Sequence, residues 1–377
     1  MKIMLLDQIA KVTYKYTFSL GNALMKYNND ITLAIDSKKE RENCKCRIWN
    51  LFNTDESGVS KIKKFKNYIS SYRKIYKEMK ENKYDVLHTQ WLIFSPIDYY
   101  YLKKIKEKCG VKLIVTIHDI LPFNQKFYDV YFHKKVYGLA DNIILQAENN
   151  KDRFKELFPE YYSKCKMIPL GHILDYADIL EKEKAREKLE IPNDKFVFLF
   201  FGQIKKVKGV DVLLKAYAEF CKTHENTLLV IAGKVWKDNF SQYQAIIDEN
   251  KIEHKVRTDI KFIPDDDVKY YYSAGDCCVL PYLDVYQSGV IQLCYAYKKP
   301  VIASNIGALR EIVKDGDTGY LCEVNDANSL CKAMNKIVSL DEVALNAMGK
   351  EGYNYVKEKY SWDNIADKVN SLYTYNG

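Results

Sequence analysis

Short apolar segments alternate with amphipathic segments along the first half of the chain. Each apolar run has the length of a buried strand, and the segment beside it carries apolar residues at the three- and four-residue spacing of a helix. The expected strands are residues 2–6, 31–35, 84–88, 112–117 and 142–146. This alternation predicts an α/β domain with a mainly parallel sheet.

The same alternation begins again after residues 166–172, KMIPLGH. The strands expected in this second half are residues 195–202, 226–233, 259–264, 276–282 and 299–304. The chain has 377 residues, more than the roughly 250–300 that a single core usually organises. We therefore predict two doubly wound, Rossmann-like domains, residues 1–170 and 171–358, that face each other across a cleft, with ligands at the carboxyl ends of the strands.

The composition indicates the class of protein and its compartment. Hydrophobic residues make up 47% and charged residues 29% of the chain, a balance typical of a globular protein. No run approaches the roughly 18 apolar residues of a membrane span, and the opening MKIMLLDQIAKV is too short for a signal peptide, so we expect a cytoplasmic protein. The ten cysteines form no CxxC pair, and we expect reduced thiols rather than a zinc site or a disulfide framework.

The net charge of +8 is unevenly distributed. Residues 1–170 contain 31 Lys and Arg against 19 Asp and Glu, whereas residues 171–377 contain 27 against 31. The basic first half indicates an anionic partner such as a lipid surface, or else it is the ordinary solvated surface of a Lys-rich chain. No aromatic and basic motif of a known nucleic-acid-binding module occurs, so we expect no nucleic-acid partner.

A loop bounded by glycines follows the expected strand 195–202. Gly202 and Gly209 bracket Lys205, Lys206 and Lys208, and helical spacing resumes after the second glycine. Backbone amides and ammonium groups at the carboxyl end of a strand suit a phosphate group, although lysines in surface loops are usually only solvated. The loop fits neither the nucleoside-triphosphate pattern GxxxxGK[ST] nor the dinucleotide pattern GxGxxG.

A second feature that suits a phosphate opens the helix expected to end near Lys298. Gln287, Ser288 and Gly289 would form its first turn, where backbone N–H groups lack helical partners and the helix dipole is positive. An ordinary helix cap explains Ser288 equally well. Together, the turn and the lysine loop suggest a site for a diphosphate.

Five motifs, in this order, resemble those of the family 4 glycosyltransferases. They are TIHDI, FFGQIKKVKGVDVLLKAY, LLVIAGK, FIPDDDVKYYYSAGDCCVLPY and QSGVIQLCYAYKKPVIASNIGALREIVKDGDTGYL. The resemblance covers nearly the whole chain, is strongest in the second half, and places the chain with a subgroup that has Gln-Ser-Gly at the entrance of the donor helix. It implies a GT-B fold and a retaining, metal-independent transfer without a cofactor, from a nucleotide-diphosphosugar bound by the second domain.

The resemblance also implies roles for single residues. Lys208 matches the lysine that binds the diphosphate, and because Gln203 replaces the usual arginine, Lys205 is expected to supply the second positive charge. His118 matches the histidine placed against the donor sugar, although by itself it would be interpreted as a strand-end histidine satisfied by the backbone. The expected catalytic residues are His118 and Lys208. The expected donor-binding residues are Gly202, Gln203, Lys205, Lys208, Gln287, Ser288, Gly289, Val290 and Glu311, the last matching the glutamate after the final glycine-rich turn.

The chain departs from the family pattern in two places. The family commonly has two glutamates eight positions apart at the donor helix, where alignment on KKPVIAS puts Val285 and Leu293. The frequent N-terminal Gly-Gly loop is replaced by AKVTYKYTFSLGNAL, which leaves Lys15 and Tyr16 as acceptor-side candidates. Two alternatives stay open: a catalytically silent GT-B partner subunit, suggested by the missing glutamates, and a GT-B sugar-nucleotide epimerase.

Residues 61–80, KIKKFKNYISSYRKIYKEMK, form a basic amphipathic segment. The apolar side chains expected on one face of this helix are Ile62, Phe65, Ile69, Tyr72, Tyr76 and Met79. Such a face packs on a sheet or lies at an anionic membrane. The family resemblance implies a hexosyltransferase of bacterial-type surface polysaccharide or glycoconjugate assembly. With this basic segment, we expect a glycan or lipid-linked acceptor and a position peripheral to the inner face of the membrane. Residues 359–377 resemble the terminal helix of the family, which crosses back to the first domain.

Overall fold

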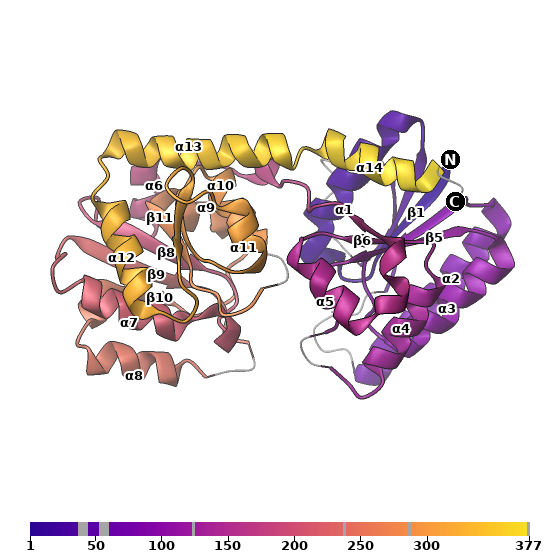
Figure 1. The fold of residues 1–377 in the computed structure, drawn as a ribbon, viewed down its shortest axis with the longest axis horizontal. Coiled ribbons are helices and arrows are strands. Elements are labelled where there is room, and N and C mark those ends of the chain that lie inside the picture. Colours follow the sequence, from indigo (N-terminus) through magenta and orange to yellow (C-terminus); the bar gives the residue numbers. More distant parts are fainter. Residues whose placement is uncertain (37–43, 53–59, 123–124, 237–238, 286–288, 375–377) are drawn as a thin grey trace. The chain divides into compact units, whose positions relative to one another are not determined.

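The computed structural model describes residues 1–36, 44–52, 60–122, 125–236, 239–285 and 289–374. The chain divides into two compact units, each a sheet covered by helices (Figure 1). Unit 1 comprises Met1–His172 and Tyr360–Gly377, and unit 2 comprises Ile173–Lys359. The chain thus enters unit 2 two residues after the division expected from the sequence, and it returns to unit 1 one residue after the expected position 359.

Unit 1 contains a parallel sheet with the order β3-β2-β1-β4-β5-β6-β7. Its strands are β1 (Lys2–Asp7), β2 (Asp30–Ile35), β3 (Arg47–Asn50), β4 (Val86–Thr89), β5 (Lys112–Ile117), β6 (Asn142–Leu145) and β7 (Cys165–Met167). Its α-helices are α1 (Ala10–Leu24), α2 (Lys61–Asn82), α3 (Ser95–Cys109), α4 (Asp129–Leu139), α5 (Asn149–Leu157) and α14 (Trp362–Thr374). The central strands are buried along nearly their whole length, which explains why they are continuous apolar runs.

The terminal helix α14 belongs to the core of unit 1, although it lies far from that core in the sequence. It packs against α1 (Figure 1), and its Ile365 and Val369 share a buried cluster with Ile3 of β1. The buried imidazole of His88 on β4 hydrogen-bonds the Tyr373 hydroxyl through Nδ1 at 2.6 Å. Burial lowers the pKa of His88 to about 3, so this contact is made by a neutral ring.

Unit 2 contains a second parallel sheet, with the order β10-β9-β8-β11-β12-β13. Its strands are β8 (Phe196–Phe201), β9 (Thr227–Ala232), β10 (Val256–Asp259), β11 (Cys277–Leu280), β12 (Val301–Ser304) and β13 (Gly319–Cys322). Its α-helices are α6 (Lys182–Lys188), α7 (Val210–Phe220), α8 (Ser241–Glu249), α9 (Asp265–Ala274), α10 (Gly289–Ala296), α11 (Gly307–Ile312), α12 (Ala327–Val338) and α13 (Glu342–Lys359). The expectation of two Rossmann-like α/β domains is confirmed.

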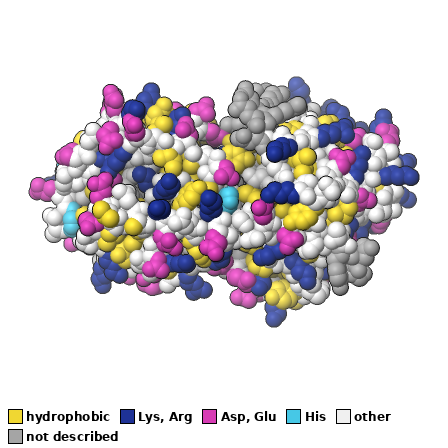
Figure 2. All heavy atoms as spheres, turned by 90° about the horizontal axis from the view of Figure 1, so that it is seen from above, with side chains coloured by type: hydrophobic (Ala, Val, Ile, Leu, Met, Phe, Trp, Pro, Cys, Tyr) yellow, Lys and Arg dark blue, Asp and Glu magenta, His cyan; other side chains and the backbone are white. Residues whose placement is uncertain are grey.

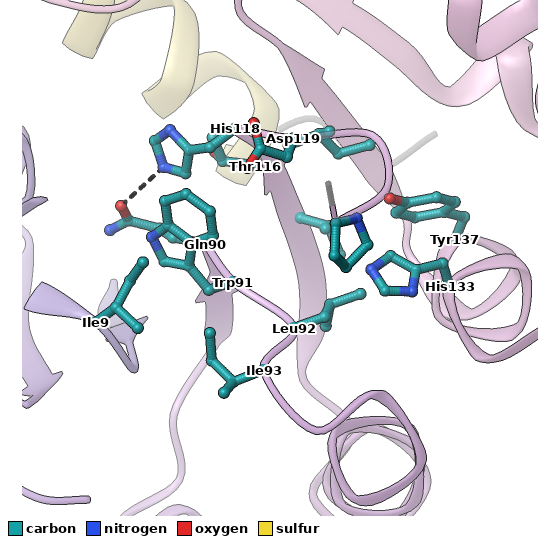
Figure 3. Close-up of a pocket in the computed structure, with 13 residues that line it drawn as sticks. Ile9, Gln90, Trp91, Leu92, Ile93, Thr116, His118, Asp119, His133 and Tyr137 are labelled. Carbon is teal, nitrogen blue, oxygen red and sulfur yellow. Dashed lines mark hydrogen bonds between the residues drawn. The ribbon is translucent and has the colours of Figure 1, made fainter. Parts of the chain in front are cut away.

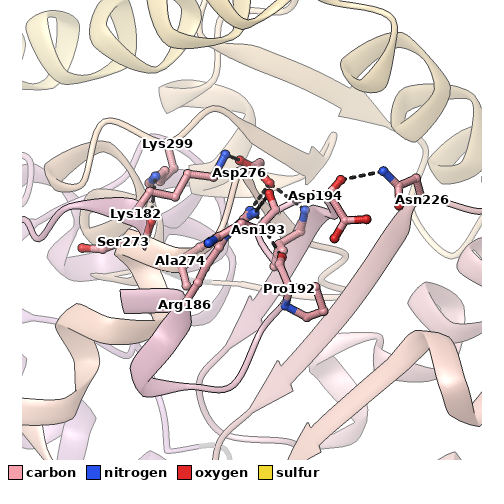
Figure 4. Close-up of polar contacts among 11 residues, drawn as sticks. Lys182, Arg186, Pro192, Asn193, Asp194, Asn226, Ser273, Ala274, Asp276 and Lys299 are labelled. Carbon is pink, nitrogen blue, oxygen red and sulfur yellow. Dashed lines mark hydrogen bonds and ion pairs between the residues drawn. The ribbon is translucent and has the colours of Figure 1, made fainter. Parts of the chain in front are cut away.

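A buried ion pair joins α6 to the middle of this second sheet (Figure 4). The Arg186 side chain is fully buried, and its Nη2 donates to Asp276 Oδ2 at 2.7 Å. The same carboxylate oxygen accepts the backbone N–H of Val197 on β8, also at 2.7 Å. Arg186 further donates to the backbone carbonyl of Ala274 at 3.0 Å. Because both charges are paired and hydrogen-bonded, their burial is tolerated.

The strand order reverses once in each sheet, and this point marks where ligands usually bind. In unit 1 the reversal lies between β1 and β4, whose carboxyl ends continue into Gln8 and Gln90. In unit 2 it lies between β8 and β11, which continue into Gly202 and Pro281. The glycine-bounded lysine loop therefore begins at the reversal point of unit 2.

The expected strand at residues 259–264 is wrong. The strand is β10, which pairs Val256 with Leu229 of β9 and ends at Asp259. The chain then turns, with Lys261 N–H donating to the Asp259 carbonyl at 2.9 Å, and Phe262 is 70% exposed. Hydrogen bonding to β9 thus determines where this edge strand lies, and the apolar run that follows it does not. An edge strand needs a hydrogen-bonding neighbour more than it needs an apolar sequence.

The apolar face expected for residues 61–80 is only partly correct. The buried residues of α2 are Tyr68, Ser71, Tyr72, Ile75 and Met79. By contrast, Ile62 is 70% and Phe65 44% exposed. The buried face therefore begins at Tyr68 instead of Ile62. It is also rotated, because Tyr68 and Tyr72 turn inward to hydrogen-bond the buried carboxylate of Asp98 at 2.5 and 2.6 Å.

The remaining expectations about composition concern the thiols and membrane spans. All ten cysteines are free thiols, and six of them are buried. No helix in the described part of the chain combines the length and the apolar character that crossing a bilayer requires.

Candidate functional site

In unit 2, the loop after β8 packs closely against the loop after β11. Gly209 has a φ of +63°, and a Cβ there would lie 1.9 Å from the carbonyl oxygen of Pro281. The backbone N–H of Leu283 donates to the Val207 carbonyl at 2.9 Å. Only glycine allows both this backbone conformation and this close approach, which explains the glycine after the lysines.

The same contact orients Lys208. Its ammonium group lies 3.5 Å from the centre of the Tyr282 ring. Burial, and secondarily the charge of Lys205, lowers the pKa of Lys208 to about 7. An ammonium group that is partly stripped of water and repelled by a neighbouring cation is stabilised by an anion. A diphosphate is such an anion. Gln203, near Lys205 and Lys208 in the same loop, is exposed and uncharged, so it adds no positive charge.

Helix α10 begins beside this loop. Gly202 has a φ of +133°, and a Cβ there would lie 3.7 Å from the Val290 side chain. The structure therefore brings together Gly202 and Val290, two of the residues expected to bind the donor, and Gly202 begins the loop that carries Lys208. Gly289 is the first residue of α10, whereas Gln287 and Ser288 lie outside the described residues. The first turn of α10 is a source of unpaired backbone N–H groups.

Apolar side chains occupy the two positions that the alignment on KKPVIAS assigns to the family's glutamates. Val285 is buried and Leu293 is half-buried on α10. Glu311 is also half-buried and lies on α11, after β12, the strand next to β11 in the sheet. Among the residues expected to bind the donor, Glu311 is the one that carries a carboxylate, and its helix follows the carboxyl end of β12.

In unit 1, a chain of buried polar side chains leads to His118. Asp7 at the end of β1 accepts a hydrogen bond from the Thr17 hydroxyl at 2.6 Å, and the Thr17 oxygen accepts one from Gln90 Nε2 at 3.1 Å. Gln90 Oε1 is the other end of this amide. The same amide oxygen lies 3.4 Å from His118 Nε2. Because an amide oxygen only accepts, His118 Nε2 carries a proton in this contact. This chain of contacts would hold the imidazole in one orientation.

Aromatic rings fix His118 from two sides. Its ring stacks on the indole of Trp91, with centroids 4.6 Å apart and an interplanar angle of 15°. Tyr16 meets it edge-on, with centroids 5.4 Å apart. Tyr16 is itself buried, which raises the pKa of its phenol. Of the two acceptor-side candidates, Tyr16 therefore contacts His118, whereas Lys15 lies half-exposed on α1 beside Tyr14.

His118 lines a pocket of about 210 Å³ at the carboxyl ends of β4 and β5. Figure 3 shows Trp91 beside His118 and, farther along, Leu92 near His133 and Tyr137 of α4. Sequence reasoning missed Gln90, Trp91 and His133. The first two directly follow β4 at the reversal point and could have been found from the strand order, whereas His133 carried no signal.

Two further expectations concern metals and surface charge. In the parts of the chain that are described, no three His, Cys, Asp or Glu side chains gather as metal ligands.

Basic and acidic side chains are mixed on the face shown in Figure 2. At the start of α2, however, Lys61, Lys63 and Lys66 are exposed beside Ile62 and Phe65, so cationic and apolar groups occur there together.

Comparisons with known proteins cover both units. Residues 181–355 match the family model "Glycosyl transferases group 1", and residues 15–176 match "Glycosyltransferase Family 4". An uncharacterized glycosyltransferase of Methanocaldococcus jannaschii is 26% identical over 310 residues, which cover 78% of this chain and 75% of that protein. A lipopolysaccharide 1,2-N-acetylglucosaminetransferase of Salmonella typhimurium is 24% identical over 309 residues, which cover 76% and 79%.

A solved structure extends the likeness to the whole fold. The Anabaena protein HepE, solved in complex with UDP, has a TM-score of 0.73 and 16% identity, and the match covers 98% of this chain and 99% of that one. The two units of the present chain, each a parallel sheet with a reversal point, are the domains of the GT-B fold. The chain is therefore a glycosyltransferase of GT-B type, whose two units match the group 1 and family 4 glycosyltransferase models.

Proposed function

We propose that the chain is a retaining glycosyltransferase that transfers a hexose from a nucleotide-diphosphosugar to a glycan or lipid-linked acceptor. The observation that carries this proposal is Lys208, a cation of lowered pKa held by Tyr282 at the reversal point of unit 2. Lys205 and the first turn of α10 supply further positive charge and N–H groups for a diphosphate. The UDP bound to the structurally similar HepE supports a nucleotide as the carrier.

The proposed reaction breaks the bond between the sugar C1 and the diphosphate oxygen. Negative charge then grows on the leaving phosphates while the sugar becomes oxocarbenium-like, so fixed cations and N–H groups lower the barrier. The acceptor oxygen bonds to C1 from the face that the diphosphate leaves, and its proton passes to a phosphate oxygen. This sequence conserves the anomeric configuration and needs no protein nucleophile, cofactor or metal ion. His118, held by Gln90 and Trp91, is proposed to contact the donor sugar.

The proposed setting is the assembly of a bacterial-type surface polysaccharide or glycoconjugate in the cytoplasm, at the inner face of the membrane. The name of the Salmonella relative, a lipopolysaccharide glycosyltransferase, supports an acceptor of this kind. The exposed lysines and apolar residues at the start of α2 support peripheral contact with anionic lipid.

One observation favours a second candidate function. Val285 and Leu293 occupy the positions of the two family glutamates and pack as apolar residues. A catalytically silent GT-B partner subunit would bind nucleotide without turnover. A GT-B sugar-nucleotide epimerase would consume the donor without forming a glycoside.

A panel of nucleotide sugars separates these functions. We expect one nucleotide sugar to raise the melting temperature and, with an acceptor extract, to yield a new glycoside whose anomeric configuration by NMR equals that of the donor. Protection without any product would indicate the silent subunit, and release of free nucleotide and epimer without acceptor would indicate the epimerase. An inverted product would contradict the retaining mechanism.

A further inference from the structure

The pocket of unit 1 contains a histidine that has no part in the proposed transfer. His133 lies on α4, is only 3% exposed, and lines the same 210 Å³ pocket as His118. Its Nδ1 lies 2.8 Å from the backbone carbonyl oxygen of Asp129, one turn earlier on the helix. Because a carbonyl oxygen only accepts, Nδ1 carries the ring proton.

The other ring nitrogen of His133 is therefore an acceptor. Burial lowers the pKa of His133 and keeps the ring neutral, so Nε2 presents a lone pair. Nε2 has no hydrogen-bond partner among the described residues. Because His133 lines the pocket, a ligand group that donates a hydrogen bond could pair with this nitrogen.

The neighbours of His133 hold it in place. The carboxylate of Asp129 accepts the Ser95 hydroxyl and the Lys126 backbone N–H, each at 2.8 Å, and so secures the start of α4. The Tyr137 hydroxyl donates to the Ile120 carbonyl at 2.9 Å. These contacts fix α4 on the loop after β5, so the position of Nε2 is set by the fold.

The rest of the pocket is predominantly apolar and carries no positive side chain. Leu92, Ile93 and Pro122 form apolar walls, Asp119 adds an acidic side chain, and of the described residues that line the pocket none is Lys or Arg. The indole Nε1 of Trp91 is buried and has no acceptor within the described part of the chain. A phosphate or carboxylate placed here would lose water without gaining a cation. Asp119 would also repel such an anion. The apolar walls and the accepting ring nitrogen of His133 thus match a neutral ligand that has both polar and apolar faces.

We propose that this pocket binds a neutral sugar ring of the acceptor, and that His133 selects it by accepting a hydrogen bond from a hydroxyl or amide group at Nε2. The assignment to the acceptor rests on the proposed function. The cavity is large enough for about one ring, so the ring nearest the reaction is the one selected. An acetamido sugar fits both features of the pocket, because its N–H can donate to Nε2 while its methyl group contacts the apolar walls.

The test uses the full chain labelled with ¹⁵N in its six histidines. The probes are N-acetylglucosamine and glucose as neutral sugars, and glucose 6-phosphate and glucuronate as anionic ones. We expect the neutral sugars to shift the ring ¹⁵N signal of His133, which His133→Phe identifies by its loss. The anionic sugars at equal concentration should leave the signal unchanged.

His133→Phe also tests the energetic role of the ring nitrogen. It keeps an aromatic ring but removes the acceptor, so N-acetylglucosamine should bind at least about tenfold more weakly. His254→Phe, an exposed position in unit 2, is the matched control and should bind like the unchanged protein. UDP affinity, measured in parallel, should be equal in all three.

Several results would overturn the assignment. These are an unshifted His133 signal in the unchanged protein, anionic sugars that bind as well as neutral ones, or unaltered sugar binding by a folded His133→Phe variant. The His133 signal can also be identified if His133→Phe does not fold. Substituting each of the five other histidines assigns their signals, and the remaining signal then belongs to His133. Failure of UDP binding with an intact sugar response would contradict the proposed function and leave the sugar site standing.

Discussion

The ammonium group of Lys208 lies 3.5 Å from the centre of the Tyr282 ring. Tyr282 follows β11 and Lys208 precedes α7, so the contact joins the two loops at the reversal point of unit 2. A cation over an aromatic face is attracted by the ring quadrupole, yet the ring replaces only part of the lost hydration, and the pKa of Lys208 stays lowered. This lysine is thus held in place before an anionic ligand arrives.

Replacing Lys208 by Ala should impair transfer strongly. The change removes a charge-assisted contact to the diphosphate and should cost roughly 2–5 kcal/mol of transition-state stabilisation, measured as a loss of kcat/KM. The melting temperature should change little. Lys206→Ala, an exposed neighbour, is the control and should retain activity. Wild-type turnover by Lys208→Ala would show that the diphosphate binds elsewhere.

Nucleotide affinity should depend on pH through Lys208. Its pKa is about 7 in the free protein, and a bound diphosphate should raise it, so binding above pH 7 must take up a proton. Affinity for UDP should therefore fall with rising pH, by up to about tenfold per unit, until the pKa of the complex is reached. Calorimetry in two buffers of different ionisation enthalpy measures the proton uptake. Lys208→Arg stays charged and should show a flatter profile; an equally steep one would refute this origin.

Activity should persist in the presence of a chelator. We expect Lys205, Lys208 and the first turn of α10 to balance the phosphate charge that a divalent ion balances in metal-dependent transferases. Initial rates with and without EDTA, on protein dialysed against EDTA, provide the measurement. Loss of activity that magnesium or manganese restores would disprove metal independence.

The start of α2 should bind anionic membranes reversibly. Each lysine near such a surface contributes about 1 kcal/mol, and the attraction fades within a Debye length of ~8 Å at physiological salt. Sedimentation with anionic vesicles at low salt should show binding that added salt reverses. Changing Lys61, Lys63, Lys64 and Lys66 to Glu should abolish it while UDP binding persists. If the unchanged protein does not sediment with the vesicles, the charge is only a solvated surface.

Breaking the buried ion pair between Arg186 and Asp276 should destabilise unit 2 without changing the residues of the donor site. Arg186→Leu leaves the buried carboxylate of Asp276 without its guanidinium partner, which should lower the free energy of unfolding by about 3–5 kcal/mol. Chemical denaturation monitored by circular dichroism measures the change. Lys184→Leu, exposed on the same helix, is the control. Lys182 also pairs with Asp276, its Nζ 2.5 Å from Oδ1. A loss below about 1 kcal/mol, as for a surface pair, would mean that Lys182 alone neutralises Asp276.

The sequence by itself determined the alternation of strands with helices, the two α/β halves and the glycine-bounded lysine loop. These features are local: a buried parallel strand must be apolar along its length, and a left-handed turn against a carbonyl, as at Gly209, requires glycine. The strands that the sequence missed, β3, β7 and β13, lie at the edges of the sheets. The motif resemblance added Lys208 and His118 as candidates. The roles of these two residues in transfer remain predictions.

Only the tertiary structure decided which face of α2 is buried, where β10 ends and what surrounds the two histidines of the pocket. Tyr68 turns inward because Asp98 lies on the neighbouring helix α3, and β10 ends where its pairing with β9 ends. His133 entered the pocket of His118 only through the packing of α4 beside the loops after β4 and β5. Each of these outcomes depends on partners far apart in the sequence, whose hydrogen bonds and burial no local pattern encodes.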